Sequence, residues 1–220
     1  MNAQPLASLT RIVRVLIMIS VAISIFALMV RGILYYKLMT VDAEVDWGFP
    51  SEEFLRVLEV SQYAITVFTN LVFIYWIYRI NKNLHALTDE PMQFTPAWSA
   101  GSFFVPIINF FRPYQVMKEI WQVSHKDASS TSALLKVWWG MWLISFFMAR
   151  VSGRMMERAE TADEVNRALS LFVVSDLLDA VKFVVMLLIV TQIWAAYRQN
   201  IDDEGLASDD ENVYALPTSS

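Results

Sequence analysis

Long apolar segments recur along this chain, each of about the length that a helix needs to cross a lipid bilayer. They cover residues 12–34, 59–78, 133–149 and 172–196. A hydrocarbon core of about 30 Å takes about 20 residues of helix, and a helix satisfies its own backbone hydrogen bonds there. With 56% of its 220 residues hydrophobic, the chain is too apolar for a soluble domain of this size. We therefore predict an all-α fold, a polytopic membrane helix bundle with four transmembrane helices.

The segment at 12–34 is predicted to stay in the protein as the first helix. A cleaved signal peptide is the alternative, but such a peptide has a shorter apolar core and a small-residue cleavage site, which is not found after this segment. Arg11 and Arg14 lie at its start, so we expect the N-terminus in the cytoplasm.

The region 94–111 is apolar but broken by proline. Thr95 followed by Pro96 is typical of a helix start. The sixteen residues that follow, to Phe111, would extend about 24 Å as a helix, which is short of a full span. Pro106 also removes a hydrogen-bond donor within that helix and leaves the Ser102 carbonyl without its partner. We predict a re-entrant or kinked half-membrane element; a short full span is the alternative and would put the C-terminal half on the other side.

The segment 113–124 has the pattern of an amphipathic helix. Its apolar side is formed by Val116, Met117, Ile120 and Trp121, together with Ser124. Its other side is polar. This pattern predicts an interfacial helix that lies in the plane of the membrane surface with its apolar side in lipid.

Two matching segments bear on the topology. Tyr78-Arg79-Ile80-Asn81 resembles 197–200, Tyr-Arg-Gln-Asn, and each follows an apolar helix. If these are equivalent helix ends, both termini are cytoplasmic. That topology places nine Lys and Arg inside and seven outside, while a five-span topology gives eight on each side, so charge barely separates the two. We predict a single membrane domain over 1–201 and an acidic disordered tail over 202–220.

Part of the chain resembles a known family. The stretches YRINKNLHAL (78–87) and FTPAWSAGSFFVPIINFFRPYQVMKEIWQVS (94–124) are similar to the signature of a bacterial membrane-protein family catalogued as domain of unknown function 4328. The family usually has Gly at the position of Ala97 and Trp or Phe at that of Ser102. The resemblance implies a multi-pass protein of the bacterial inner (cytoplasmic) membrane and brings no activity. The matching motif positions are Arg79, Asn81, Thr95, Pro96, Trp98, Gly101, Pro106, Asn109, Arg112, Pro113, Tyr114, Glu119 and Trp121.

Five ionisable residues are predicted near the outer half of the membrane and form a candidate polar pathway. Asp176, Asp179 and Lys182 share a broad face of the last span, Glu59 has a similar depth in the second, and Arg31 lies near the outer end of the first. Charges within the membrane are costly unless they are paired or hydrated, so they mark candidate functional sites. The alternative is that the helices protrude beyond the bilayer, or that Asp179 and Lys182 pair and reach toward the interface.

A second candidate lies beside Pro106. Asn109 and Arg112 are three positions apart, and an amide with a guanidinium at a helix break can bind an anionic group. The structural alternative is that Asn109 caps the freed backbone while Arg112 meets a lipid phosphate or Glu119.

The sequence offers no catalytic constellation. It has no cysteine, its two histidines lie in polar connections, and it has neither a nucleophile elbow nor a glycine-rich phosphate loop. We therefore expect no enzyme activity, no metal and no cofactor, and the lack of a basic stripe argues against nucleic acid.

The preferred hypothesis is a non-enzymatic membrane module that interacts with membrane lipids, or with a protein partner at the cytoplasmic face. The alternative is a small carrier or channel that uses the charge cluster and the broken helix.

Overall fold

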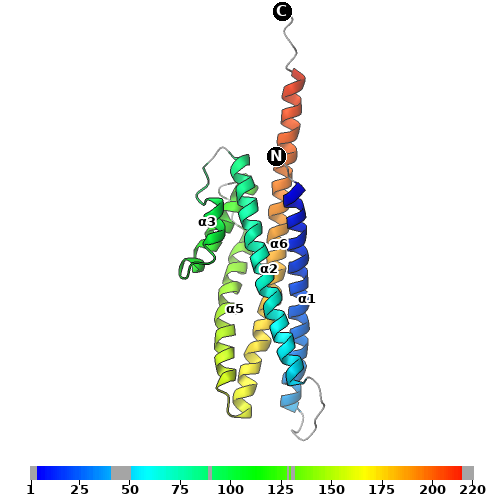
Figure 1. Ribbon diagram of the computed structural model, residues 1–220, viewed down its shortest axis with the longest axis vertical. Helices are drawn as coiled ribbons and strands as arrows, with labels where there is room; N and C mark the ends of the chain where they lie inside the picture. The colour runs from blue at the N-terminus through cyan, green and yellow to red at the C-terminus, as the bar shows by residue number, and fades with distance from the viewer. Residues whose placement is uncertain (1–3, 41–50, 89–90, 128, 130–131, 215–220) are drawn as a thin grey trace, which may run out of the picture.

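The computed structural model describes residues 4–40, 51–88, 91–127, 129 and 132–214, and within these ranges all regular secondary structure is helical. Four long helices and a short helical hairpin make up the bundle (Figure 1). The elements are α1 (Gln4–Thr40), α2 (Glu52–Leu87), α3 (Pro96–Gly101), the 3-10 helix η1 (Ile108–Phe110), α4 (Arg112–Ser124), α5 (Ala133–Glu157) and α6 (Ala162–Tyr214).

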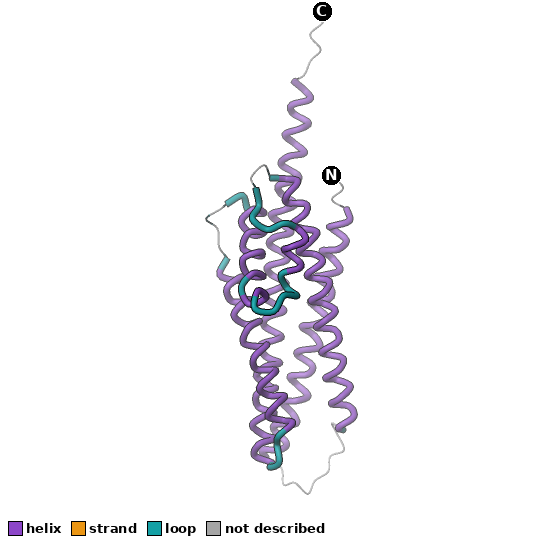
Figure 2. The backbone as a smooth tube through the Cα atoms, turned by 60° about the vertical axis from the view of Figure 1, so that its left-hand side comes forward, coloured by secondary structure: helices purple, strands orange, loops and turns teal. Residues whose placement is uncertain are grey.

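The four long helices lie side by side and alternate in direction, so that both chain termini are at the same end of the bundle (Figure 1). Helix α1 packs against α6 and α2, and α6 also packs against α5. The connection between α5 and α6 is at the opposite end, and the hairpin of α3 and α4 is at the end with the termini (Figures 1 and 2).

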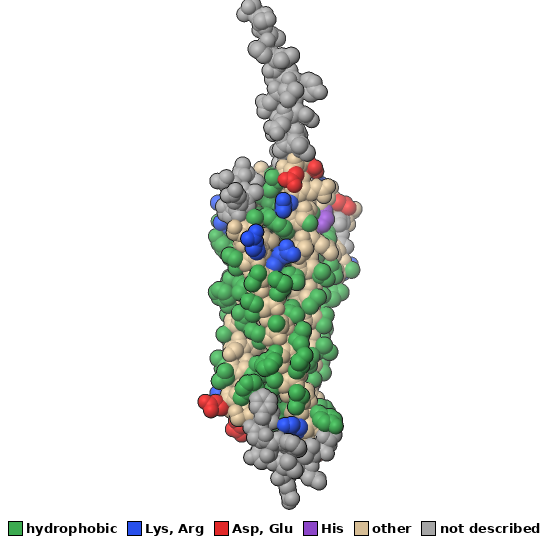
Figure 3. All heavy atoms as spheres, turned by 90° about the vertical axis from the view of Figure 1, so that its right-hand side faces the viewer, with side chains coloured by type: hydrophobic (Ala, Val, Ile, Leu, Met, Phe, Trp, Pro, Cys, Tyr) green, Lys and Arg blue, Asp and Glu red, His purple; other side chains and the backbone are tan. Residues whose placement is uncertain are grey.

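Three helical segments are long and apolar enough to cross a membrane: 6–37, 52–87 and 133–157. They contain the predicted spans 12–34, 59–78 and 133–149. Their outer surfaces are apolar, as expected for lipid contact: Met29, Val60 and Phe147 are each more than half exposed. In Figure 3, hydrophobic side chains cover the middle of the visible face and charged side chains lie toward its two ends. The chain is therefore built as a membrane protein.

The segment 172–196, predicted as the fourth span, lies within α6. That helix is continuous from Ala162 to Tyr214. Residues 202–214 are thus helical, although the sequence predicted a disordered tail from 202 onward. The physical reason is that no proline occurs before Pro217 to stop the helix. Residues 215–220 lie outside the described part of the chain.

The largest core cluster lies at the end of the bundle that holds the termini. Trp76, Ile80, Ile120 and Tyr197 are fully buried there, from α2, α4 and α6. The Trp76 indole N–H also donates to the Thr10 hydroxyl of α1 at 2.9 Å. Toward the opposite end the buried apolar cluster is much smaller and comprises Ala27, Val30 and Leu58. The apolar packing is therefore concentrated in one half, and the other half has room for polar groups.

The central region begins as predicted and ends differently. The Thr95 hydroxyl accepts a hydrogen bond from the Trp98 amide, so α3 does start at Pro96. The helix ends at Gly101, before Pro106 is reached, and turns and η1 then lead to α4. The expected helix from 96 to 111 with a single break at Pro106 is therefore wrong. The break extends over about ten residues, and within it Ile107 has a φ of 65°, in the region that side chains other than glycine rarely adopt.

Helix α4 has the predicted amphipathic pattern but a different environment. Val116, Met117, Ile120, Trp121 and Ser124 are all buried. They pack against α2, α5 and α6. The bundle covers this side of the helix, so the expectation that it would lie in lipid is wrong. Apolar periodicity identifies the buried side of a helix without telling whether protein or lipid covers it.

Candidate functional site

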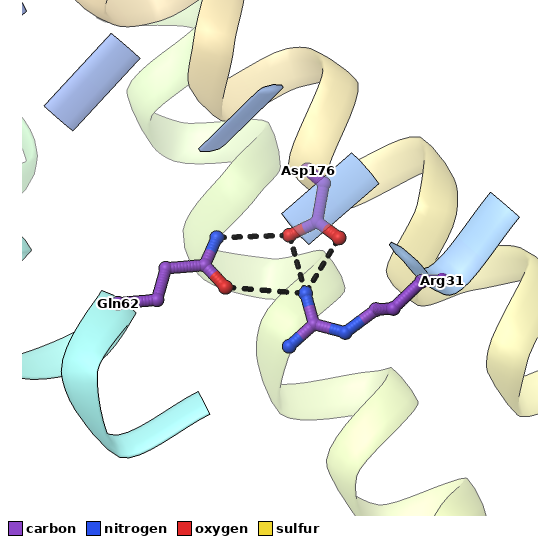
Figure 4. Close-up of polar contacts among 3 residues, drawn as sticks. All are labelled: Arg31, Gln62 and Asp176. Atoms are coloured by element: carbon purple, nitrogen blue, oxygen red, sulfur yellow. Dashed lines mark hydrogen bonds and ion pairs between the residues drawn. The ribbon is translucent and has the colours of Figure 1, made fainter. Parts of the chain in front are cut away.

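A buried ion pair joins two helices in the half of the bundle away from the termini. Arg31 on α1 and Asp176 on α6 approach to 2.5 Å between Nη1 and Oδ2, and their side chains are only 11% and 5% exposed. Gln62 on α2 completes the cluster, because its amide accepts from Arg31 at 3.2 Å and donates to Asp176 at 2.9 Å (Figure 4). The guanidinium also lies 5.5 Å from the centre of the Phe172 ring. This buried polar cluster thus connects α1, α2 and α6.

A second ion pair lies about one turn further along α6. The Lys182 ammonium donates to Asp179 Oδ1 at 2.5 Å, with a separation of three residues along the helix. Lys182 is 8% exposed, and its ammonium lies 5.0 Å from the ring of Phe183. The sequence alternative that Asp179 and Lys182 pair with one another therefore describes the geometry, with the Lys182 side chain buried and that of Asp179 half-buried.

The two ion pairs border one groove of about 360 Å³. Helix α2 forms one side of the groove, α5 and α6 form the other, and α1 contributes Arg31. All five residues of the predicted polar pathway line it. The complete lining is Arg31, Glu59, Gln62, Tyr63, Thr66, Val67, Asn70, Trp142, Ser145, Phe146, Ala149, Phe172, Ser175, Asp176, Asp179 and Lys182.

The groove walls are charged along one part and aromatic along another. Tyr63 on α2 is 72% exposed. Trp142 and Phe146, one turn apart on α5, are stacked with ring centres 5.8 Å apart. Glu59 also lines the groove, and within the described part of the chain it forms no ion pair. The groove therefore combines an unpaired carboxylate with flat apolar surfaces.

Ser145 is a groove residue that sequence reasoning missed. It is 5% exposed, and its hydroxyl has no hydrogen-bond partner among the described residues. A buried hydroxyl without a partner costs roughly 1–3 kcal/mol, so this atom is available to a ligand or to water. Ser145 is a small polar residue within the apolar span 133–149, and that is the only sequence signal that could have identified it. Gln62, Thr66 and Asn70 were missed in the same way.

The groove ends before the hairpin of α3 and α4. One turn beyond Asn70 and Trp142, the Phe73 and Trp138 rings meet edge to face with centres 6.1 Å apart, and both residues are buried. Asn109 does not line the groove. The polar surface thus opens in the half away from the termini and is closed by aromatic packing toward the other half.

The structure does not bring Asn109 and Arg112 together as a site. The Arg112 guanidinium donates to Gln115 at 2.9 Å and lies 5.4 Å from the Phe94 ring centre. The Asn109 Oδ1 atom is buried without a partner among the described residues. The structural alternative offered a lipid phosphate or Glu119 as the partner of Arg112; among the described residues its contacts are with Gln115 and Phe94.

Glu119 instead fixes the start of the hairpin. Its carboxylate accepts hydrogen bonds from the backbone N–H groups of Gln93 and Phe94, the latter at 3.2 Å. Trp121 stacks on His125 with ring centres 4.2 Å apart. Pro113 is buried in the first turn of α4. These motif residues hold α3 and α4 together and against the bundle.

The remaining motif residues are also remote from the groove. Arg79 donates to the Tyr75 hydroxyl at 3.2 Å. Asn81 is completely buried, and both polar atoms of its amide lack a partner among the described residues. Trp98 is 42% exposed on α3. None of the thirteen motif positions lines the groove; Gly101, Pro106 and Tyr114 also lie in or beside the hairpin.

Within the described residues, no group of three or more His, Asp or Glu side chains is arranged to hold a metal ion. His85 and His125 each lie beside a backbone carbonyl oxygen of their own helix, those of Asn81 and Trp121, at 2.9 and 2.8 Å. Neither histidine lines the groove, whose ionisable side chains are those of Arg31, Glu59, Asp176, Asp179 and Lys182 together with Tyr63.

Comparison with known proteins places the chain in a family. No curated protein and no solved structure matches it. A family model described as "Domain of unknown function (DUF4328)" matches residues 44–195. The matched region includes α2, the hairpin, α5 and the groove-lining part of α6, whereas Arg31 precedes it. Because the match covers more than half of the chain, the protein belongs to the DUF4328 family.

Proposed function

We propose that the protein crosses the bacterial inner membrane four times, with both termini in the cytoplasm. Residues 172–196 of α6 run alongside the apolar parts of α1 and α5 (Figure 1). The two Tyr-Arg segments at 78–79 and 197–198 lie on α2 and α6 in the half of the bundle that holds the termini, each after the apolar part of its helix. Aromatic and basic residues at helix ends are typical of a membrane interface. In this topology the hairpin of α3 and α4 enters the membrane from the cytoplasmic side and turns back to the same side.

We infer that the protein is a non-enzymatic membrane module whose ligand is an amphiphile with a cationic head, held in the groove. The observation that carries this proposal is the charge of the groove lining. Its carboxylates are those of Glu59, Asp176 and Asp179. Its two cations, Arg31 and Lys182, are already paired with Asp176 and Asp179. Glu59 remains for a positively charged group. The Trp142, Phe146 and Tyr63 rings suit both an alkyl chain and the face of a cation.

A small carrier is the second candidate. It is favoured by the two ion pairs that follow one another along α6, because pairs of this kind can exchange partners with a charged substrate. The edge-to-face contact of Phe73 with Trp138 would then be the barrier that opens. A protein partner that binds α4 from the cytoplasm would meet its polar side, since its apolar side is covered by the bundle.

Binding of octyltrimethylammonium to the purified protein in a nonionic maltoside detergent tests the proposed function. Ala149→Trp fills the groove, and Ile144→Trp adds the same side chain to the exposed surface of the same helix. We expect calorimetric binding to the wild type and to Ile144→Trp, and none to Ala149→Trp. Glu59→Gln should weaken binding about fivefold, and Glu53→Gln, at an exposed position outside the groove, should not. Equal binding to both tryptophan variants would refute the groove as the site.

A further inference from the structure

At the end of the bundle away from the termini, three arginines at the end of α5 and the start of α6 line one pocket. Arg154 lies in the last turn of α5, Arg158 caps the C-terminal end of that helix, and Arg167 lies on α6. All three side chains belong to exposed residues. The pocket has a volume of about 400 Å³, and its other lining residues are Val151, Met155 and Glu164. It is separate from the groove, with which it shares no lining residue.

The charges of this pocket are not balanced. Three guanidinium groups face a single carboxylate, that of Glu164. That carboxylate already accepts hydrogen bonds from the backbone N–H groups of Glu160 and Thr161, at 2.9 and 3.2 Å. Within the described part of the chain, neither Arg154 nor Arg158 forms an ion pair. Like charges brought together in this way repel one another unless an anion lies between them.

The position of the pocket indicates which anion it suits. Arg154 follows the end of the apolar segment 133–149 by five residues, which is about 8 Å along a helix. This distance corresponds to the head-group layer outside the hydrocarbon core. Val151 borders the pocket and is 50% exposed, and Phe147, one turn earlier on the same helix, is 56% exposed. The apolar surface of α5 therefore continues from the pocket toward the membrane interior.

We propose that this pocket binds the phosphate head group of an anionic phospholipid, with an acyl chain along α5. Guanidinium groups bind phosphate oxygens through paired, charge-assisted hydrogen bonds. The phosphate lies among Arg154, Arg158 and Arg167, and the chain follows Val151 and Phe147. Because its charge is opposite to that of the groove, the pocket selects a different ligand.

Native mass spectrometry of the detergent-purified full chain, titrated with phosphatidylglycerol, tests this proposal. Arg154→Gln/Arg158→Gln removes two pocket charges, and Arg56→Gln/Arg150→Gln removes two charges at the same end of the bundle without altering the pocket. A basic side chain near anionic lipid contributes about 1 kcal/mol, so we expect the pocket variant to bind phosphatidylglycerol about thirtyfold more weakly and the control to bind as the wild type does.

Two further ligands separate the possible sources of the anion. Phosphatidylcholine carries the phosphate without net charge, and inorganic phosphate carries the charge without acyl chains. Weaker binding of both than of phosphatidylglycerol supports an anionic lipid. An unchanged affinity in the pocket variant, or an equal loss in the control, would overturn the proposal. Binding of inorganic phosphate as tight as that of the lipid would also overturn it, since the chain contact along α5 would then contribute nothing.

Discussion

Arg31 and Asp176 are 145 positions apart in the chain, and their side chains meet at 2.5 Å between α1 and α6. The pair is buried and Gln62 bonds to both partners. A buried pair of this kind contributes less to stability than its geometry suggests, because both charges lose their hydration. Its main effect is to set the position of α1 against α6 beside the groove.

Removing one partner of this pair should be more harmful than removing both. Asp176→Leu leaves the Arg31 charge buried without a counter-charge, and we expect a loss of about 3–5 kcal/mol in the free energy of unfolding. Arg31→Met/Asp176→Leu replaces the pair by apolar groups and should recover most of that loss. Chemical unfolding in detergent micelles, followed by tryptophan fluorescence, measures both. Equal losses in the single and double variants would contradict the prediction.

Glu119 should control how firmly the hairpin is held. Glu119→Gln replaces a charged acceptor of the Gln93 and Phe94 N–H groups by a neutral one, which costs about 1 kcal/mol. Hydrogen exchange of amides 93–102 should then be roughly fivefold faster. Glu157→Gln, at an exposed position on α5, serves as the control and should leave these rates unchanged. Identical exchange in both variants would show that Glu119 does not hold the hairpin.

The start of α6 should respond to acid in a defined direction. Hydrogen bonds from the Glu160 and Thr161 backbone N–H groups, followed by the interaction with the Thr161 side chain, lower the pKa of the exposed Glu164 carboxyl. The stabilisation of the helix start by Glu164 is therefore present above the pKa of the unfolded chain and is lost as the pH falls through the lower, folded pKa. The carboxyl carbon resonance of Glu164 measures the titration, and Thr161→Val should shift its midpoint upward. A midpoint at or above that of an ordinary glutamate would contradict this account.

The proposed topology predicts which ends of the bundle are accessible from outside the cell. The chain has no cysteine, so single cysteines can be labelled without background. Glu160→Cys, between α5 and α6, should react in intact cells with a maleimide that does not cross membranes. Asp127→Cys, after α4, should react only after permeabilisation. If residues 94–111 crossed the membrane instead, the two positions would show the reverse pattern.

The groove could be predicted in part because helical spacing and depth follow from sequence. The separations of Asp176, Asp179 and Lys182 place these residues on one broad face, and counting from the helix ends places Glu59 and Arg31 at a similar depth. The partner of Arg31 could not be predicted, since a contact between α1 and α6 depends on how those helices pack. Ser145 was missed for the same reason.

The central hairpin shows a second limit of sequence reasoning. Thr95 and Pro96 mark a helix start by local chemistry alone, and that start was confirmed. The end of α3 at Gly101 and the turn at Ile107 have no comparably local signal. Likewise, the apolar side of α4 was identified correctly from the sequence. Because lipid and the protein interior are both apolar, the sequence could not tell which of them covers that side, and only the folded bundle shows that it is protein.

The proposed function requires that the groove between α2 and α5 is hydrated and open toward the outside of the cell. Thr66→Cys places a thiol in the groove, and Ile144→Cys places one on the exposed apolar surface of α5. A charged methanethiosulfonate reacts with the thiolate, which forms in water and not in lipid. In intact cells we predict rapid modification of Thr66→Cys and none of Ile144→Cys. A Thr66→Cys protein that stays unmodified, or that reacts only after permeabilisation, would contradict the claim.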